Sequence, residues 1–327
     1  MPDLHDRPRI GFIGLGIMGH PMAGHLAKAG YAMSAFDTDP AAIGRLRDIH
    51  PGIDAVESAA AVGAASDIVL TMLPDGEVVQ QVALGPGGLM ETMASGSLLL
   101  DTSSAQPWLT LATAAALAER GIGMIDAPVS GAQWGAEQAN LVFMVGGAPV
   151  DVERVQPILD LLGRAVFHCG PLGSGHIMKC INNTITAMTF LATAEGLSLG
   201  KRAGLDPAAM NDVLNESTGG SWITVNHIPQ RILSRTFDDP FRLELMLKDV
   251  KIAAQLARDY QLPLPFAAHC ERIYQDANAF AGAGRSLSEL VRWVEHCTGV
   301  DITGGGADPQ TSYMITPNAA QERDSDG

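Results

Sequence analysis

Residues 10–19 read Ile-Gly-Phe-Ile-Gly-Leu-Gly-Ile-Met-Gly, and this stretch decides the fold. It carries the pattern Gly-x-Gly-x-x-Gly directly after an apolar run and directly before a helical pattern, which is the context that a dinucleotide-binding turn requires. Gly14 allows the tight turn, Gly16 lets a pyrophosphate approach the backbone, and Gly19 lets helix and strand pack closely. A glycine turn without a ligand is the alternative. We expect a dinucleotide to contact the turn at Gly14, Gly16, Ile17, Met18 and Gly19.

Asp37 ends the next apolar run, where folds of this kind place an acid that accepts hydrogen bonds from the ribose hydroxyls. Its neighbours are Thr38 and Asp39, and no arginine is adjacent in the sequence. A 2′-phosphate would meet two carboxylates there, so we predict NAD as the cofactor, with NADP less favoured. The alternative is that Asp37 only caps a loop, because aspartate is common in turns.

Short apolar runs alternate with helical patterns over the first 165 or so residues, which predicts an α/β domain with a mostly parallel sheet. One helix is expected over residues 20–29, ending at Gly30. The expected strands cover residues 9–13, 31–36, 67–73, 97–100, 124–127 and 141–145.

From about residue 168 the strand signals fade and helical patterns dominate. We expect one long helix over residues 176–203, ended by Gly204, with Asp206-Pro207 opening the next. Further helices are expected over residues 207–215, 243–260, 265–281 and 287–296. The predicted domains are 1–167, which binds the dinucleotide, 168–303, which is helical and serves substrate binding and oligomerisation, and 304–327, a disordered tail.

Composition narrows the class of protein. A net charge of −15 gives no general reason to bind nucleic acid or an anionic membrane surface. The four cysteines form no Cys-x-x-Cys pair, which suggests a reducing compartment. No run of about 18 apolar residues and no signal-peptide pattern is present, so we expect a cytoplasmic protein without a membrane span. The histidines show no metal-binding spacing, and we expect no metal.

Five blocks, in order, resemble the β-hydroxyacid dehydrogenase family, which includes 3-hydroxyisobutyrate dehydrogenase and tartronate semialdehyde reductase. They are the opening Gly11-Phe-Ile-Gly-Leu-Gly-Ile-Met-Gly-His-Pro-Met22, Thr71-Met-Leu-Pro74, Asp101-Thr-Ser-Ser-Ala-Gln-Pro107, Asp126-Ala-Pro-Val-Ser-Gly131 and Gly173-Ser-Gly-His-Ile-Met-Lys-Cys-Ile-Asn-Asn183. We refer to the last three as the nicotinamide block, the substrate block and the catalytic block. A shorter match is Leu247-Lys-Asp249. The resemblance implies an N-terminal Rossmann-type domain, a long interdomain helix and an all-α C-terminal domain.

The resemblance also implies roles for single residues. Leu73 and Pro74 would line the cofactor site, and Ser104 would lie against its nicotinamide end. Lys248 would lie close to substrate and cofactor. The substrate would be held by Ser130 and the Gly131 backbone, with Ala132, Asn182 and Trp222 also at the substrate site.

Two departures from the family's pattern lie in or near the substrate block. The family usually has Ser-Gly-Gly where this chain has Ser130-Gly131-Ala132, and Gly-Thr-Leu where it has Ala139-Asn140-Leu141. Ala132 adds a methyl group where backbone normally approaches the substrate carboxylate. Whether 3-hydroxyisobutyrate itself is the substrate therefore stays open.

Lys179, Asn182 and Asn183 fall at i, i+3 and i+4, so they can share one face of the long helix. The catalytic block implies that Lys179 is the general acid and base, and that Asn183 holds the reacting hydroxyl or carbonyl. From spacing alone, Lys179 would be a solvated helix lysine. Trp222 could equally serve core packing. His176 is expected to cap the start of the helix.

These features predict an NAD-dependent oxidoreductase that interconverts a small β-hydroxyacid and its semialdehyde. Alternatives of the same architecture are an imine reductase, against which Lys179 argues, and a threonate-type sugar-acid dehydrogenase. A non-catalytic NAD-binding scaffold is a further alternative, and the retained Lys179 and Asn183 argue against it. The expected partners are a small carboxylate substrate and further copies of the chain, as a homodimer or homotetramer.

Overall fold

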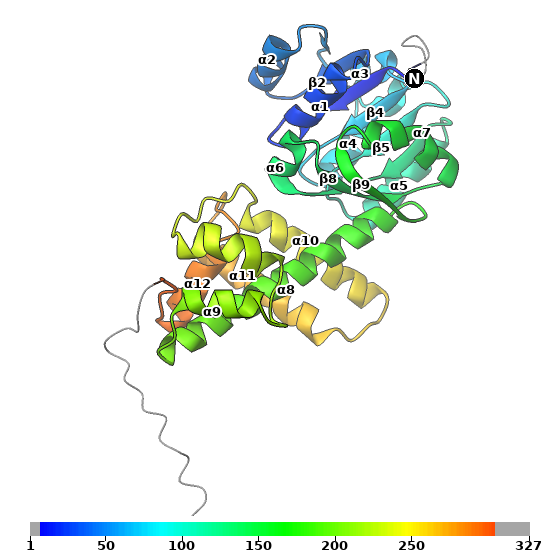
Figure 1. Cartoon of the computed structure of the whole chain (residues 1–327). Coiled ribbons are helices and arrows are strands. Elements are labelled where there is room, and N and C mark those ends of the chain that lie inside the picture. Colours follow the sequence, from blue (N-terminus) through cyan, green and yellow to red (C-terminus); the bar gives the residue numbers. More distant parts are fainter. Residues whose placement is uncertain (1–6, 305–327) are drawn as a thin grey trace, which may run out of the picture. The chain divides into compact units, whose positions relative to one another are not determined.

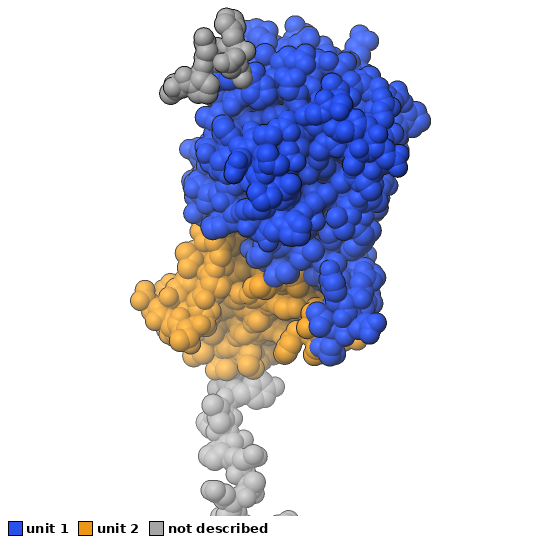
Figure 2. Space-filling view, turned by 90° about the vertical axis from the view of Figure 1, so that its right-hand side faces the viewer, with its two compact units in different colours: residues 1–183, 249–263 blue, residues 184–248, 264–327 orange. Residues whose placement is uncertain are grey.

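The computed structural model describes residues 7–304, which fall into two compact units. The first unit comprises residues 1–183 and 249–263, and the second comprises residues 184–248 and 264–327 (Figure 2). The boundary therefore falls inside two helices, which each contribute residues to both units. The predicted tail beyond Gly304 lies outside the described residues.

The first unit holds a nine-stranded sheet. Its strands are β1 (Ile10–Ile13), β2 (Met33–Phe36), β3 (Asp54–Ala55), β4 (Ile68–Thr71), β5 (Leu98–Asp101), β6 (Gly123–Asp126), β7 (Val129–Ser130), β8 (Leu141–Gly146) and β9 (Gly163–Gly170). Its helices are α1 (Gly19–Lys28), α2 (Pro40–Ile49), α3 (Ala59–Ala65), α4 (Gly76–Leu84), the 3₁₀-helix η2 (Leu89–Glu91), α5 (Pro107–Ala118), α6 (Ala132–Glu137) and α7 (Pro149–Leu159).

The strand order is β3-β2-β1-β4-β5-β6-β8-β7, with β9 paired to β8 (Figure 1). The first six strands of this order pair in parallel, as in doubly wound dinucleotide-binding sheets, whereas β8 runs antiparallel to β6 and β7. All six predicted strands occur, so the prediction of a mostly parallel α/β domain is confirmed. The sequence analysis missed β3 and β7, which have two residues each, and the edge strand β9, whose side chains are half-buried or exposed and whose apolar run is only three residues long.

Side chains alternate between two hydrophobic cores, one on each face of the sheet. Ile10 and Phe12 of β1 pack with α1 and α2, whereas Ile13 packs with α3 and α4. Leu99 of β5 likewise faces the second core, while its neighbours face the first. Both faces are thus covered by helices, which is why most positions in these parallel strands are apolar.

The second unit is helical. Helix α8 (Ser174–Arg202) spans 29 residues and contributes residues from Thr184 onward. It ends as predicted at Gly204, which has a φ of +95°, and Asp206 caps the next helix by accepting from the N–H of Ala208 and Ala209. The remaining helices are α9 (Pro207–Asn215), α10 (Leu243–Asp259), of which the first unit holds the part from residue 249, α11 (Pro265–Ala281) and α12 (Glu289–Thr298).

A π-helix, η3 (Ile223–Leu233), was not predicted from the sequence. Pro229 lies inside it, and the proline interrupts the helical pattern that sequence analysis relies on. Across residues 7–304, no helix combines the length and the apolar character that crossing a membrane would require.

Candidate active site

The glycine-rich turn between β1 and α1 has the geometry that its three glycines predict. Gly14 has a φ of +96°, and a Cβ at this position would lie 2.3 Å from the carbonyl oxygen of Met72. A Cβ on Gly19 would lie 1.8 Å from the carbonyl oxygen of Gly14. A Cβ on Gly16, by contrast, would meet nothing within 4 Å. Gly14 and Gly19 are therefore required by the fold itself, whereas Gly16 leaves open space beside the backbone.

That open space suits a dinucleotide. Gly16 and Ile17 are exposed, Met18 is half-buried against the core, and α1 begins at Gly19 with its N-terminal N–H groups beside the turn. A pyrophosphate can approach such a turn closely and accept hydrogen bonds from those N–H groups. The residues of this turn therefore fit a dinucleotide cofactor.

Asp37 is bound to the same turn. Its Oδ2 accepts a hydrogen bond from the N–H of Leu15 at 2.6 Å, and its Oδ1 accepts from the N–H of Asp39 at 2.8 Å. Asp37 therefore caps the loop, which the sequence analysis gave as the alternative to ribose binding. A carboxylate oxygen has a second lone pair, so the same group can still accept from a ribose hydroxyl. Arg45, six residues after Asp39 on α2, has its guanidinium 3.6 Å from the Asp39 carboxylate.

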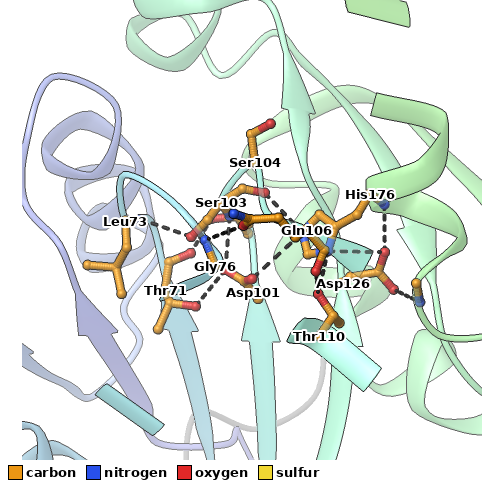
Figure 3. A network of polar contacts seen from close by, with 12 residues as sticks. Thr71, Leu73, Gly76, Asp101, Ser103, Ser104, Gln106, Thr110, Asp126 and His176 are labelled. Atoms are coloured by element: carbon orange, nitrogen blue, oxygen red, sulfur yellow. Dashed lines mark hydrogen bonds and ion pairs between the residues drawn. The ribbon is translucent and has the colours of Figure 1, made fainter. Parts of the chain in front are cut away.

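Hydrogen bonds join the ends of β4 and β5 and the loops that follow them (Figure 3). Thr71 donates to Asp101 at 2.9 Å, and the N–H of Leu73 donates to Ser103 at 2.9 Å. The Leu73 side chain lies against the glycine-rich turn, since a Cβ on Gly14 would be 3.0 Å from its Cδ2. The structure thus brings Leu73 to the predicted cofactor turn, with Pro74 next to it in the chain.

Asp126 of the substrate block holds the start of α8. Its two carboxylate oxygens accept hydrogen bonds from the N–H of Gly173 and of His176, both at 2.7 Å (Figure 3). Burial raises the pKa of Asp126, while the His176 ring and the two N–H donors oppose that effect. A carboxylate at the positive end of a helix stabilises it, so Asp126 caps α8.

Glycines in the catalytic block make this cap possible. A Cβ on Gly175 would lie 2.2 Å from the carbonyl oxygen of Met144 and 2.8 Å from Asp126. A Cβ on Gly146 of β8 would likewise lie 2.3 Å from Oδ1 of Asp126. The Gly-x-Gly of the catalytic block therefore lets α8 begin directly against β8 and the substrate block.

The prediction that His176 caps this helix is wrong. Its ring turns away from the N–H groups of α8 and contacts Thr110 and the carbonyl oxygen of Ser103, because Asp126 already satisfies those N–H groups.

Cys180, which follows Lys179 in the chain, has no nucleophilic character. Burial, together with the charge of Asp249, raises the pKa of its thiol to about 12.

Lys179, Asn182 and Asn183 follow on α8. Lys179 is half-buried and Asn183 is buried, with 5% of its surface exposed. Asn182 donates from Nδ2 to Oδ1 of Asn183 at 3.1 Å. A solvated surface position is therefore excluded for Asn183, and Lys179 lies one helical turn before it.

Asp249 is a residue that sequence reasoning missed. Its Oδ2 accepts from Nδ2 of Asn183 at 2.5 Å, and its Oδ1 accepts from the hydroxyl of Ser104 at 2.8 Å. The structure thus brings the predicted catalytic Asn183 and the predicted nicotinamide-end Ser104 to one buried carboxylate. The match Leu247-Lys-Asp249 was the available signal, but it drew attention to Lys248 alone.

The predicted substrate residues occupy three places, namely residues 130–132, Asn182 on α8, and Trp222 in the second unit. Ser130 ends β7, and Gly131 and Ala132 form the exposed turn into α6, with Ala132 at a φ of +52°. Trp222 and Lys248 belong to the second unit. Trp222 is 64% exposed, which argues against the core-packing alternative, and its ring centroid lies 6.2 Å from that of His227. Within residues 7–304, no group of three His, Cys, Asp or Glu side chains is arranged to hold a metal.

Comparison with known proteins agrees with this arrangement. A family model described as the NAD-binding domain of 6-phosphogluconate dehydrogenase matches residues 9–170, and one described as the NAD-binding domain of NADP-dependent 3-hydroxyisobutyrate dehydrogenase matches residues 173–294. The chain is 36% identical to 2-(hydroxymethyl)glutarate dehydrogenase of Eubacterium barkeri, over 91% of this chain and 98% of that protein. The chain belongs to the β-hydroxyacid dehydrogenase family.

Other members of this family are also similar. The 3-hydroxyisobutyrate dehydrogenase of Pseudomonas aeruginosa is 36% identical over 81% of this chain and 90% of its own length. A structure of the Mycobacterium tuberculosis 3-hydroxyisobutyrate dehydrogenase with L-serine superposes with a TM-score of 0.81 at 30% identity, covering 88% of this chain and 99% of that one. As a member of the β-hydroxyacid dehydrogenases, the protein is a nicotinamide-dependent hydroxyacid dehydrogenase, and the predicted resemblance is confirmed.

Proposed function

We propose that the protein interconverts a small β-hydroxyacid and its semialdehyde, with NAD as cofactor and Lys179 as general acid and base. One observation carries the proposal. Asn183, one turn after Lys179, is joined through Asp249 to Ser104 of the nicotinamide block. This contact supports a single active site. In that site, the face of α8 that bears Lys179 would meet the predicted nicotinamide end of the cofactor.

The residues would divide the chemistry as follows. A bound nicotinamide supplies the carbon that accepts the hydride on oxidation. The neutral amine of Lys179 takes the proton from the substrate hydroxyl as the carbonyl forms, and in reduction the ammonium returns that proton to the oxygen. Asn183 holds the reacting oxygen, while Ser130 and the Gly131 N–H hold the carboxylate.

NAD is proposed over NADP because Asp37, which is bonded to the glycine-rich turn and followed closely by Asp39, stands at the end of β2, where folds of this kind carry the acid that binds the adenosine ribose. A 2′-phosphate would face both carboxylates. Arg45 could attract it, but its guanidinium already lies 3.6 Å from Asp39. Substitution of Asp37 is expected to disturb the glycine-rich turn as well, because the same carboxylate binds the Leu15 N–H.

The first test is absorbance at 340 nm with purified protein, NAD or NADP, and a panel of acids. The panel contains 2-(hydroxymethyl)glutarate and 3-hydroxyisobutyrate, the acids after which the relatives are named. It also contains L-serine, glycerate, 3-hydroxypropionate, 4-hydroxybutyrate and threonate. We expect turnover of at least one β-hydroxyacid, with a higher kcat/KM for NAD than for NADP. Turnover of threonate alone, or of cyclic imines with NADPH and no acid, would replace the proposed substrate class. Binding of NAD without turnover of any compound would favour the scaffold.

We also propose that the enzyme is a homodimer or homotetramer in the cytoplasm. The second unit exposes large apolar side chains, among them Leu199, Val213 and Phe266 at 73%, 64% and 79%. Exposed apolar surface of this kind favours association. All four cysteines are unpaired, which suits a reducing compartment. Sedimentation at micromolar concentration tests the assembly, and a monomer there would contradict it.

A further inference from the structure

His176 lies in the first turn of α8 and has no part in the function proposed above. Its surface is 1% exposed. It precedes Lys179 by three residues and Asn183 by seven, so the three positions follow one face of the helix. A buried imidazole ring therefore lies on the same helix face as Lys179 and Asn183.

The ring has four polar neighbours within the first unit (Figure 3). Nδ1 lies 2.8 Å from the hydroxyl of Thr110, and Nε2 lies 3.1 Å from the carbonyl oxygen of Ser103. Asp101 Oδ2 lies 3.6 Å from Nε2, and Asp126 Oδ2 lies 3.7 Å from Nδ1. Since Nε2 faces a carbonyl and a carboxylate oxygen, which both only accept, Nε2 carries a proton and donates to Ser103.

Ser103 and Ser104 are therefore attached to α8 at two points. His176 holds the carbonyl of Ser103, and Asn183 holds the hydroxyl of Ser104 through Asp249. The two attachment points are seven residues apart, which is about 10 Å along a helix. Lys179 lies between them on the same face.

We propose that His176 is a positioning residue for the reaction: it ties the nicotinamide block to the first turn of α8, and so sets the distance between Lys179 and Ser104. The proposal rests on the proposed function of Lys179. Ser103 is also bound to Leu73 and Asp101, but these bonds hold it to the ends of β4 and β5 and not to α8. Without the ring, the link through Asn183 and Asp249 would be the one remaining tie between α8 and the Ser103–Ser104 segment, and the distance between them would be less fixed. Hydride transfer is sensitive to such errors, because a displacement of about 1 Å can cost about 100-fold in rate.

The ring also has a structural role, since it lies beside two buried carboxylates. Asp101 Oδ2 has no hydrogen-bond partner among the described residues, and the ring is the group that faces it. Loss of the ring will therefore lower stability, so the test must separate stability from catalysis.

Three variants and one control make that separation. His176→Leu removes every polar contact of the ring, whereas His176→Gln keeps a donor for Ser103 and an acceptor for Thr110. Thr110→Val removes the partner of Nδ1, together with the contact of that hydroxyl to the Gln106 carbonyl oxygen at the start of α5. Tyr274→Phe is the matched control, because its buried hydroxyl likewise donates to a backbone carbonyl, that of Ala187, but within the second unit.

The first measurement is steady-state kinetics with the best acid of the panel, with melting temperatures in parallel. We expect His176→Leu to lower kcat about 10- to 100-fold, with KM for NAD changed less than about threefold. His176→Gln should retain kcat within about fivefold, and Thr110→Val should lose about threefold. The deuterium isotope effect on kcat, with substrate deuterated at the reacting carbon, should rise in His176→Leu because hydride transfer becomes slower. Tyr274→Phe should lower the melting temperature and leave kcat unchanged.

The second measurement is hydrogen exchange of the protein without cofactor. Amides of residues 173–183 should exchange faster in His176→Leu than in wild type, and at the wild-type rate in Tyr274→Phe. This measurement does not depend on activity, so it tests the attachment of the nicotinamide block to α8 even if no acid is turned over. Absence of turnover would contradict the proposed function but not this attachment.

The proposal is overturned if His176→Leu keeps kcat within twofold of wild type, or if its kcat falls no further than that of Tyr274→Phe at equal loss of melting temperature. Unchanged exchange over residues 173–183 would also overturn it. If His176→Leu does not fold, Thr110→Val decides, and an unchanged kcat and isotope effect in that variant would contradict the proposal.

Discussion

Asp249 accepts a hydrogen bond from the side-chain amide of Asn183, and its other oxygen accepts one from Ser104. Asn182 in turn donates to the amide oxygen of Asn183. The amide of Asn183 is therefore held in one orientation, with its nitrogen toward Asp249. Asp249 is 1% exposed, so water does not compete for these bonds.

Two substitutions of Asp249 should separate the effect of its hydrogen bonds on kcat from the effect of its charge. Asp249→Ala leaves the Asn183 amide without its acceptor, and we expect kcat to fall about 100-fold. Asp249→Asn can still accept from Asn183, so a loss of about 10-fold is expected. Asp259→Ala, an exposed position on the same helix, is the control and should leave kcat unchanged. Equal activity of Asp249→Ala and wild type in steady-state assays would show that the contact does not serve catalysis.

Lys179→Ala should abolish turnover while NAD binding persists. General acid and base catalysis contributes about 100- to 10,000-fold, and the loss in kcat should fall in that range. Binding of NAD, followed by fluorescence titration, should change less than about threefold, because the glycine-rich turn is untouched. Lys251→Ala, at an exposed position of α10, is the matched control. A near-normal kcat in Lys179→Ala would remove Lys179 from the mechanism.

The three glycines of the turn should respond differently to a methyl group. Gly19→Ala places a Cβ 1.8 Å from a carbonyl oxygen, so both folding and NAD binding should suffer. Gly16→Ala meets no protein atom within 4 Å, so its melting temperature should stay near wild type while NAD affinity falls at least about 10-fold. Gly44→Ala on α2 also meets nothing within 4 Å, and should gain about 1 kcal/mol without affecting binding. Normal NAD affinity in Gly16→Ala would place the pyrophosphate elsewhere.

Ala132 and Ala139 stand where the family usually has glycine, and both have left-handed backbones, with φ of +52° and +50°. An L-residue is strained in this region, so Ala132→Gly and Ala139→Gly should each gain about 0.5–1 kcal/mol in free energy of unfolding. Ala115→Gly, at an exposed position in α5, should lose about 1 kcal/mol and so provides a control of opposite sign. Urea denaturation measures all three. Destabilisation by both loop substitutions would show that the strain is absent.

Thiol reactivity should follow burial. Burial favours the neutral thiol and raises the pKa of Cys180 to about 12 and that of Cys270 to about 11, so neither forms appreciable thiolate at pH 8. Cys297 is exposed and should react first with iodoacetamide, and the exposed Cys169, whose pKa burial also raises, should react more slowly. Peptide mapping by mass spectrometry measures each site, with guanidinium-unfolded protein as the control. Labelling of native Cys180 as fast as Cys297 would contradict its burial.

The strands of the Rossmann-type domain and the helices around them were predictable because they depend on local patterns. Gly14 needs a positive φ, Gly204 ends a helix, and Asp206 caps the next one, each within a few residues of chain. The edge strand β9 was missed because its side chains are not buried and show no apolar period. The π-helix η3 was missed because Pro229 breaks the pattern.

The sequence by itself determined the dinucleotide turn, the α/β class, and the shared helix face of Lys179, Asn182 and Asn183, because backbone conformation and side-chain periodicity are local properties. Only the tertiary structure decided the partners of the buried polar groups. Asp249 meets Asn183 across 66 residues of chain and Ser104 across 145, and His176 reaches Ser103 across 73. A buried donor or acceptor must find a partner, but which one it finds depends on what packs against it, and that is settled only when distant elements come together.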